Sequence, residues 1–220
     1  MRTVEGVPAT FVFADIAGFT ALTEAHGDIE AAALAADFAS AVRAELSPNS
    51  GQYIKTIGDA VMLRIPDPGE AIRLGVRIVD GVLQDRAPSV RVGVNYGPAI
   101  ERDGDYFGAA VNLAARVSAL AKGGEVLISG QTAALVPALE GIYFESRGRH
   151  ELRNVREPIE VFAAVQVGAA KGTLAVDPVC NMMVDPDRAV GRLVHDGSAY
   201  FFCSLACAGD FARRPDHFSS

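Results

Sequence analysis

Two aspartates stand where a protein chain can hold a divalent cation. Asp15 follows the aromatic and β-branched run 10–13, which is typical of a buried strand, and it precedes the helical pattern that opens at Gly18–Thr20. A carboxylate at a strand end, beside the backbone N–H groups of a helix start, can hold a cation while those N–H groups bind phosphate oxygens. Asp59 lies in a Gly-Asp turn between two strand-like runs. The simpler alternatives are a helix cap at Asp15 and an ordinary turn at Asp59.

The two acids converge at one rim of a sheet if their strands are neighbours. A pair of carboxylates that clamps two divalent ions suits phosphoryl chemistry, because the metals stabilise both the attacking and the leaving oxygen. Magnesium is usually held by one or two carboxylates together with substrate phosphates. Metal-assisted chemistry on a phosphate is therefore one interpretation of Asp15 and Asp59.

A second pair of polar side chains shares one face of an expected helix. Asn112 and Arg116 are four residues apart in an otherwise apolar helical pattern over 108–121. An amide and a guanidinium side by side suggest an anionic group opposite them. The alternative is a polar stripe that faces solvent.

Composition limits the classes of function. The chain has 220 residues, half of them hydrophobic and 21% charged, so it can bury a sizeable core, and its net charge of −7 argues against a nucleic-acid-binding protein. The first six residues contain no apolar core of a secretory signal, and no apolar run approaches the roughly 18 residues of a membrane span. We therefore expect a cytoplasmic protein.

Strand and helix patterns alternate along the first three quarters of the chain. Hairpins are mixed into the alternation, which favours an α+β sandwich over a doubly wound parallel sheet. The expected strands are 10–13, a hairpin over 53–65, 90–96 with its end at Gly97–Pro98, 125–128, and a closing pair over 142–151 and 158–165. The expected helices are 22–46 with a break at 26–28, 68–84, 108–121 and 130–136.

Three motifs in this order closely resemble the class III nucleotidyl cyclases. They are Phe13–Thr20, Lys55–Asp59 and Asp105–Arg116, and the resemblance covers residues 9–166. It implies a ferredoxin-like α/β sandwich that works as a head-to-tail homodimer, with two equivalent active sites at the subunit interface. The implied reaction is attack of the ribose 3′-oxygen on the α-phosphate, which expels pyrophosphate and closes the 3′,5′-cyclic ester.

The resemblance also implies roles for single residues on one subunit. Asp15 and Asp59 would bind two Mg²⁺ or Mn²⁺ ions, with help from the backbone of Ile16. The backbone of Gly18, Phe19 and Thr20 would hold the phosphates.

The other subunit would bind the base and the ribose. Lys55 and Asp105 offer a donor and an acceptor that suit the adenine edge, and guanylyl cyclases usually carry a different pair, so ATP is the expected substrate. Asn112 would orient the ribose, and Arg116 would stabilise the transition-state charge. Arg153 falls where the family commonly has a phosphate-binding lysine. The arginine keeps the positive charge of that lysine and alters its geometry.

The chain after a small, flexible linker at 167–173 has different chemistry. Residues 174–218 contain all three cysteines, Cys180, Cys203 and Cys207, and thiolates select Zn²⁺ or Cu⁺. This tail resembles the YHS domain, a small module associated with metal binding, and Asn181 replaces a glycine that is usual in that family. A fourth ligand could be His195, His217 or solvent. The alternative is that the cysteines are buried apolar residues.

The sequence thus predicts a homodimeric adenylyl cyclase that makes cyclic AMP from ATP. The C-terminal module is expected to regulate its activity in response to metal or redox state. One alternative is a guanylyl cyclase. An alternative of another class is a metal-binding sensor that uses the cyclase fold only as a dimerisation scaffold. The presence of both Asp15 and Asp59 favours the enzyme.

Overall fold

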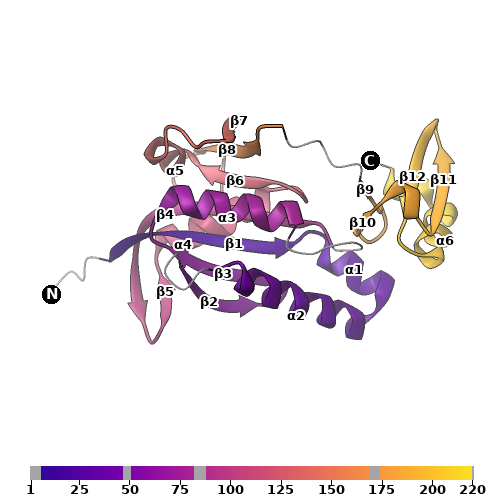
Figure 1. The fold of residues 1–220 in the computed structure, drawn as a ribbon, viewed down its shortest axis with the longest axis horizontal. Helices are drawn as coiled ribbons and strands as arrows, with labels where there is room; N and C mark the ends of the chain where they lie inside the picture. The colour runs from indigo at the N-terminus through magenta and orange to yellow at the C-terminus, as the bar shows by residue number, and fades with distance from the viewer. Residues whose placement is uncertain (1–5, 47–50, 82–87, 169–173, 220) are drawn as a thin grey trace.

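One eight-stranded sheet forms the centre of the molecule (Figure 1). The computed structural model describes residues 6–46, 51–81, 88–168 and 174–219. The sheet order is β2-β3-β1-β4-β6-β8-β7, with β5 paired to the end of β4. The strands are β1 (Val7–Ile16), β2 (Gln52–Ile57), β3 (Ala60–Ile65), β4 (Val90–Arg102), β5 (Asp105–Phe107), β6 (Val126–Ser129), β7 (Ile142–His150) and β8 (Ile159–Gln166). The expected α+β class is confirmed.

Strand β1 is buried along most of its length, and its alternation divides the core into two layers. Val12, Ala14 and Ile16 face a cluster that includes residues of α2 (Asp28–Ala44) and α3 (Pro68–Gly81). Phe11 and Phe13 face the opposite cluster, which contains the buried side of α4 (Ala109–Leu120). Helices α2 and α3 therefore cover one face of the sheet and α4 covers the other.

Local patterns predicted most elements to within a few residues. The 53–65 hairpin is β2 and β3, joined by a turn at Gly58, whose φ is 63°. The break at 26–28 separates α1 (Phe19–His26) from α2, and α5 (Gly130–Leu135) follows β6 as expected. The expected end of the third helix, near residue 84, lies outside the described residues.

The predicted end of a strand at Gly97–Pro98 is wrong. Strand β4 continues to Arg102 and turns at Asp103–Gly104, where both φ angles are positive, into β5. Pro98 lies opposite Pro8 of β1. In an antiparallel ladder, every second pair of opposite residues exchanges no hydrogen bond, so two prolines, which lack an N–H, are tolerated at such a pair. The polar 100–105 segment is thus a β-ribbon that carries Asp105.

The C-terminal module is built on two short hairpins and a helix, seen in orange and yellow in Figure 1. Its elements are β9 (Ala175–Val176), β10 (Met183–Val184), a 3₁₀ turn (Pro186–Arg188), β11 (Gly191–His195), β12 (Ser198–Phe202), α6 (Leu205–Arg213) and α7 (Pro215–Phe218). Phe202 and Phe211 form its centre and pack in one cluster with Leu22 of α1 and Ala31 of α2. The small module therefore shares its core with the first domain, as its size requires.

Candidate active site

Asp15 and Asp59 meet at the end of β1. Asp15 pairs with Ala60 at the start of β3, and Asp59 is the residue before Ala60 in the hairpin turn. Burial, together with a hydrogen bond to Asp15 and repulsion from its charge, raises the pKa of Asp59 to about 6. A divalent cation bound between the two carboxylates would offset the repulsion that raises the pKa of Asp59.

Arg91 is the third charged group at this position, and sequence reasoning missed it. Its Nε and Nη2 donate to Asp15 Oδ2 over 2.9 and 2.6 Å, and the two residues are paired between β1 and β4. A cation that binds Asp15 through this oxygen has to compete with the guanidinium. The available signal was a lone charge within the apolar run that opens β4.

The residues after β1 form the backbone turn that sequence reasoning expected to hold phosphates. Ile16 is buried at the strand end, and Gly18 has a φ of 71° where it precedes α1. Phe19 is half-buried against the core, whereas Thr20 is exposed. Only two residues thus separate the strand that carries Asp15 from the first N–H groups of α1.

Lys55 and Asp105 form an ion pair, although 50 residues separate them in the chain. Lys55 Nζ lies 2.5 Å from Asp105 Oδ2, and the hydrogen bond from the lysine lowers the pKa of Asp105. Both side chains keep about a third of their surface exposed. The pair presents a donor and an acceptor beside the turn that closes the β4–β5 ribbon.

A bulge in β2 directs Lys55 to the correct face. Tyr53 pairs with Leu63 on the α2 side of the sheet, and strict alternation would place Lys55 on that side too. Instead Lys55 pairs with Met62, so Ile54 and Lys55 both lie opposite one residue of β3. Met62 belongs to the cluster on the α4 side. The extra residue therefore brings Lys55 to the sheet face that also carries Asp15.

Asn112 and Arg116 lie on the outer side of α4. Asn112 is exposed and Arg116 is half-exposed, while Ala110, Val111 and Ala114 face the sheet. The expected shared helical face is confirmed, and it turns away from its own protomer. Arg153 is exposed in the connection between β7 and β8, at the opposite edge of the sheet from Lys55.

A buried polar network that the sequence did not indicate fixes α4 on the sheet. Asn95 is fully buried in β4 and donates through Nδ2 to the carbonyl of Ala110 over 2.9 Å. Its Oδ1 accepts from Ser129 Oγ and from Gln131 Nε2, both at 2.7 Å. Asn95 thereby ties the first turn of α4 to β6 and α5, which positions Asn112 two residues further on.

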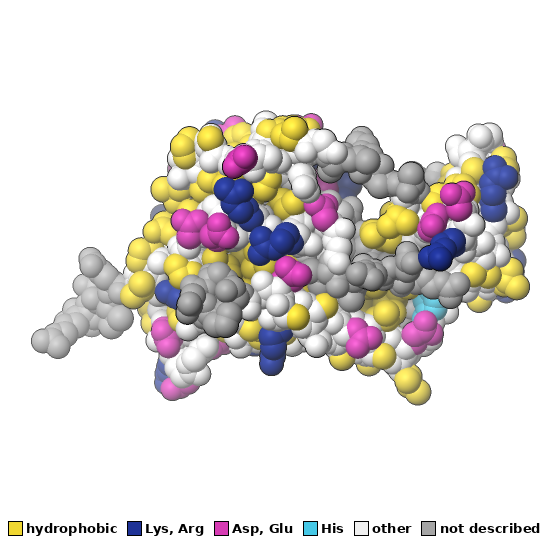
Figure 2. All heavy atoms as spheres, in the orientation of Figure 1, with side chains coloured by type: hydrophobic (Ala, Val, Ile, Leu, Met, Phe, Trp, Pro, Cys, Tyr) yellow, Lys and Arg dark blue, Asp and Glu magenta, His cyan; other side chains and the backbone are white. Residues whose placement is uncertain are grey.

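Charge on the α2 and α3 side of the molecule is mixed. Figure 2 shows acidic and basic side chains interspersed on this face, with no basic stripe. The expectation that nucleic acid is not a partner stays a prediction.

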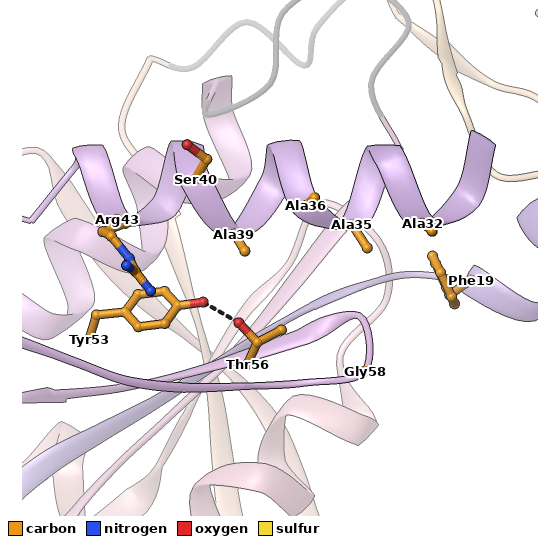
Figure 3. Close-up of a pocket in the computed structure, with 10 residues that line it drawn as sticks. All are labelled: Phe19, Ala32, Ala35, Ala36, Ala39, Ser40, Arg43, Tyr53, Thr56 and Gly58. Carbon is orange, nitrogen blue, oxygen red and sulfur yellow. Dashed lines mark hydrogen bonds between the residues drawn. The ribbon is translucent and has the colours of Figure 1, made fainter. Parts of the chain in front are cut away.

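A pocket of about 660 Å³ lies on this same side, between α2 and the β2–β3 hairpin (Figure 3). Alanines of α2 line one wall, and Arg43 stacks on the Tyr53 ring, whose hydroxyl bonds Thr56. The sheet separates this pocket from Lys55 and Asp105, so it is a different feature from the candidate active site.

The three cysteines of the module come together, and a histidine of the first domain joins them. Cys180 Sγ lies 3.4 Å from Cys203 Sγ, which lies 3.8 Å from Cys207 Sγ. Hydrogen bonds from the thiols of Cys180 and Cys203 lower the pKa of Cys207. His26 Nε2, at the end of α1, is 3.5 Å from Cys203 Sγ.

The two histidines that sequence reasoning offered as fourth ligands lie elsewhere. His195 Nε2 is 3.1 Å from Asp216 Oδ1, and His217 belongs to α7 beside Arg214 and Phe218. Among the described residues, His26, Cys180, Cys203 and Cys207 form a group of four whose ligand atoms are close enough to hold one ion together.

Two family models match the chain in succession. Residues 4–166 match the adenylate and guanylate cyclase catalytic domain, and residues 175–220 match the YHS domain. The chain is similar to the pH-sensitive adenylate cyclase MT1302 of Mycobacterium tuberculosis, with 37% identity over 166 residues, which are 74% of this chain and 41% of that protein. It is also similar to an adenylate cyclase of Streptomyces griseus, with 35% identity over 119 residues, which are 54% of this chain and 30% of that protein. The chain thus spans less than half the length of these curated relatives.

Solved structures share the fold. The adenylyl cyclase CyaB of P. aeruginosa aligns with a TM-score of 0.63 at 23% identity, over 78% of this chain and 100% of that one. No helix among the described residues is long and apolar enough to cross a membrane.

Proposed function

We propose that this chain, which belongs to the adenylate and guanylate cyclase catalytic domain family, is an adenylyl cyclase that converts ATP to 3′,5′-cyclic AMP and pyrophosphate. The observation that carries the choice of ATP is the Lys55–Asp105 pair, which offers one donor and one acceptor side by side. The adenine edge offers the complementary amine donor and ring-nitrogen acceptor. Expected domain bounds are 9–166 for the cyclase, 167–173 for the linker and 174–218 for the module.

The donor set at the end of β1 fits two Mg²⁺ or Mn²⁺ ions. Asp15 and Asp59 provide carboxylate oxygens, and the strand end provides the carbonyl of Ile16. Burial, with a smaller contribution from the nearby Asp15, raises the pKa of Asp59, and a bound cation would offset both effects. When bound, the ions supply charge neutralisation for the phosphates and acidify the ribose 3′-hydroxyl.

The chain's own groups bind and orient the nucleotide. The N–H groups at Gly18–Thr20 hold phosphate oxygens at the start of α1, and Lys55 with Asp105 fixes the base. Asn112 orients the ribose so that its 3′-oxygen faces the α-phosphate. Arg116 stabilises the negative charge that grows on the phosphates as pyrophosphate leaves, and Arg153 adds a further positive charge.

Two copies of the chain complete each site. Lys55 lies two strands away from β1, about 10 Å sideways, and the outer face of α4 turns its polar pair away from its own acids. A two-fold axis on the α4 side of the sheet brings the acids of one copy to the base-binding and α4 residues of the other. We place this homodimer in the cytoplasm, where ATP, its proposed substrate, is available.

The test is turnover by the purified full-length protein with ATP or GTP in Mn²⁺, with the cyclic product identified by mass spectrometry. Cyclic AMP formed in preference to cyclic GMP supports the proposal. A preference for GTP would favour the guanylyl cyclase instead. Absence of both products from a folded protein would favour the scaffold alternative, in which the cysteine module is the functional part.

A further inference from the structure

Four ligand atoms from two domains converge beside α1. They are the Sγ atoms of Cys180, Cys203 and Cys207 and Nε2 of His26, and all four lie within 4.8 Å of one another. The side chain of His26 is only 12% exposed, and the three cysteines are buried. The cluster is therefore enclosed between the first domain and the module.

The separations fit a tetrahedral ion. Zinc bonds sulfur at about 2.3 Å and imidazole nitrogen at about 2.0–2.1 Å, so tetrahedral ligands stand about 3.6–3.8 Å apart. The observed distances from Cys203 Sγ are 3.4 Å to Cys180, 3.8 Å to Cys207 and 3.5 Å to His26. A disulfide would need sulfurs about 2.05 Å apart. The spacing is that of ligands around a common centre.

We propose that His26 completes a Cys₃His zinc site that joins the cyclase domain to the module. Three thiolates and one imidazole are a set that structural zinc sites use, and four protein ligands leave no open position. The site stands on the cluster geometry alone and does not depend on the nucleotide chemistry proposed above.

Neighbouring groups hold the ligands as a metal site requires. Nδ1 of His26 lies 3.5 Å from Oε1 of Glu30, in the first turn of α2, and such a carboxylate leaves Nε2 free to bind metal. Buried Asp177 accepts the N–H groups of Val179 at 2.9 Å and Cys203 at 2.8 Å. One carboxylate thus fixes the loop that carries Cys180 and the strand end that carries Cys203.

Backbone contacts also fix the module against the first domain. Pro88 and Met182 form an antiparallel bridge, and the N–H of Ser89 donates to the carbonyl of Asn181 over 3.2 Å. The carbonyl of Ser89 in turn accepts from Ala17 over 2.8 Å. Asn181, in the left-handed region at φ 61°, packs its amide against Gly18. Both ends of α1 therefore touch the module: its last residue, His26, through the zinc site and the residue before its start, Gly18, through Asn181.

The experiment compares single variants of the full-length protein. Metal content by plasma mass spectrometry should give one zinc per chain, and Co²⁺ substitution should give the absorption of a tetrahedral thiolate site. His26→Ala should weaken zinc binding by more than about 100-fold, since even residues outside the ligand shell contribute 10–100-fold. The matched control His195→Ala should bind zinc like the parent protein.

A rescue variant separates metal binding from a packing role. His26→Cys should restore zinc and shift the Co²⁺ spectrum towards four thiolates, whereas a packing role would not produce that shift. Hydrogen exchange in α1 should rise in His26→Ala and stay unchanged in His195→Ala. Unchanged zinc affinity in His26→Ala, no zinc uptake by the parent protein, or a preference for Cu⁺ over Zn²⁺ would each overturn the proposal.

Discussion

Lys55 Nζ lies 2.5 Å from Asp105 Oδ2 because one extra residue in β2 turns the lysine to the α4 side of the sheet. Asp105 reaches the same place from the other direction, since β4 runs on past Pro98 and returns as β5. The pair is therefore made by two departures from regular strand geometry. Bulges of this kind are frequent beside active sites, where they re-aim a side chain.

Removing either member of this pair should relax base selection. Lys55→Ala and Asp105→Ala should each reduce the ratio of kcat/KM for ATP over GTP by at least about tenfold, because the substrate loses a matched polar partner. The free energy of unfolding should change by less than about 1 kcal/mol, since the pair is partly exposed. Steady-state kinetics and urea unfolding measure the two effects.

The control for this prediction is Arg102→Ala, at the exposed tip of the same ribbon. It should leave the ratio unchanged. An unchanged ratio in both pair variants would contradict the assignment of Lys55 and Asp105 to the base.

Asp59 should make the metal-free protein less stable as pH rises. Its folded-state pKa of about 6 exceeds the ordinary value of 3.8, so between these values the folded state binds more protons than the unfolded state. The contribution of Asp59 to the free energy of unfolding therefore falls as the pH rises from 3.8 to about 6. The loss is about 1–2 kcal/mol once the shift is discounted for solvent screening.

Urea unfolding at pH 4 and pH 7 without metal, for the parent protein and Asp59→Asn, measures this effect. The variant should be the more stable protein at pH 7 and should lose that advantage at pH 4. Added Mg²⁺ should stabilise the parent and not the variant, and Asp59→Ala should abolish turnover. A variant advantage that is equal at both pH values would contradict the raised pKa of Asp59.

Asn95 should be among the most sensitive polar residues of the core. Asn95→Ala removes the side-chain partner of the Ala110 carbonyl and one of the two side-chain partners of the Ser129 hydroxyl, which keeps Thr132, and we expect a loss of about 2–3 kcal/mol. Gln131→Ala, at an exposed neighbour in the same network, should cost less than about 1 kcal/mol. Equal effects of the two substitutions on urea unfolding would show that the network does not anchor α4.

Gly18 and Asn181 should be energetically coupled. A Cβ on Gly18 would stand 2.2 Å from Asn181 Nδ2, and the φ of 71° adds strain, so Gly18→Ala should destabilise the docked module. Asn181→Gly removes the clash and keeps a residue that tolerates its own positive φ. The double variant should therefore recover part of the loss, measured by a double-mutant cycle in urea. Strict additivity would mean that the two residues do not touch.

Sequence patterns predicted the elements that local chemistry decides. The hairpin over 53–65 and the α4 helix follow from alternation and from helical periodicity, both of which span only a few residues. The continuation of β4 through Pro98 could not be predicted, because it depends on a pairing with Pro8, ninety residues earlier. The bulge at Ile54 leaves no mark in the residue types either.

The site residues divide in the same way. Asp15, Asp59, Asn112 and Arg116 could be selected because a turn or a helical spacing placed them. Arg91 offered only a lone charge in an apolar run and His26 offered no signal, since each acquires its role from a partner distant in the sequence. His26 lies 177 residues before Cys203, and no ligand spacing connects them.

The central claim is that each active site is divided between two copies of this chain. Co-expression of Asp59→Asn and Arg116→Ala chains with different tags, followed by tandem purification, isolates heterodimers that hold one intact site of two. These heterodimers should show about half the wild-type rate of cyclic AMP formation, although each variant alone is inactive. Heterodimers of Asp15→Asn with Asp59→Asn serve as the control and should stay inactive. Failure of the first pair to form a heterodimer, or a heterodimer with no activity, would contradict the account.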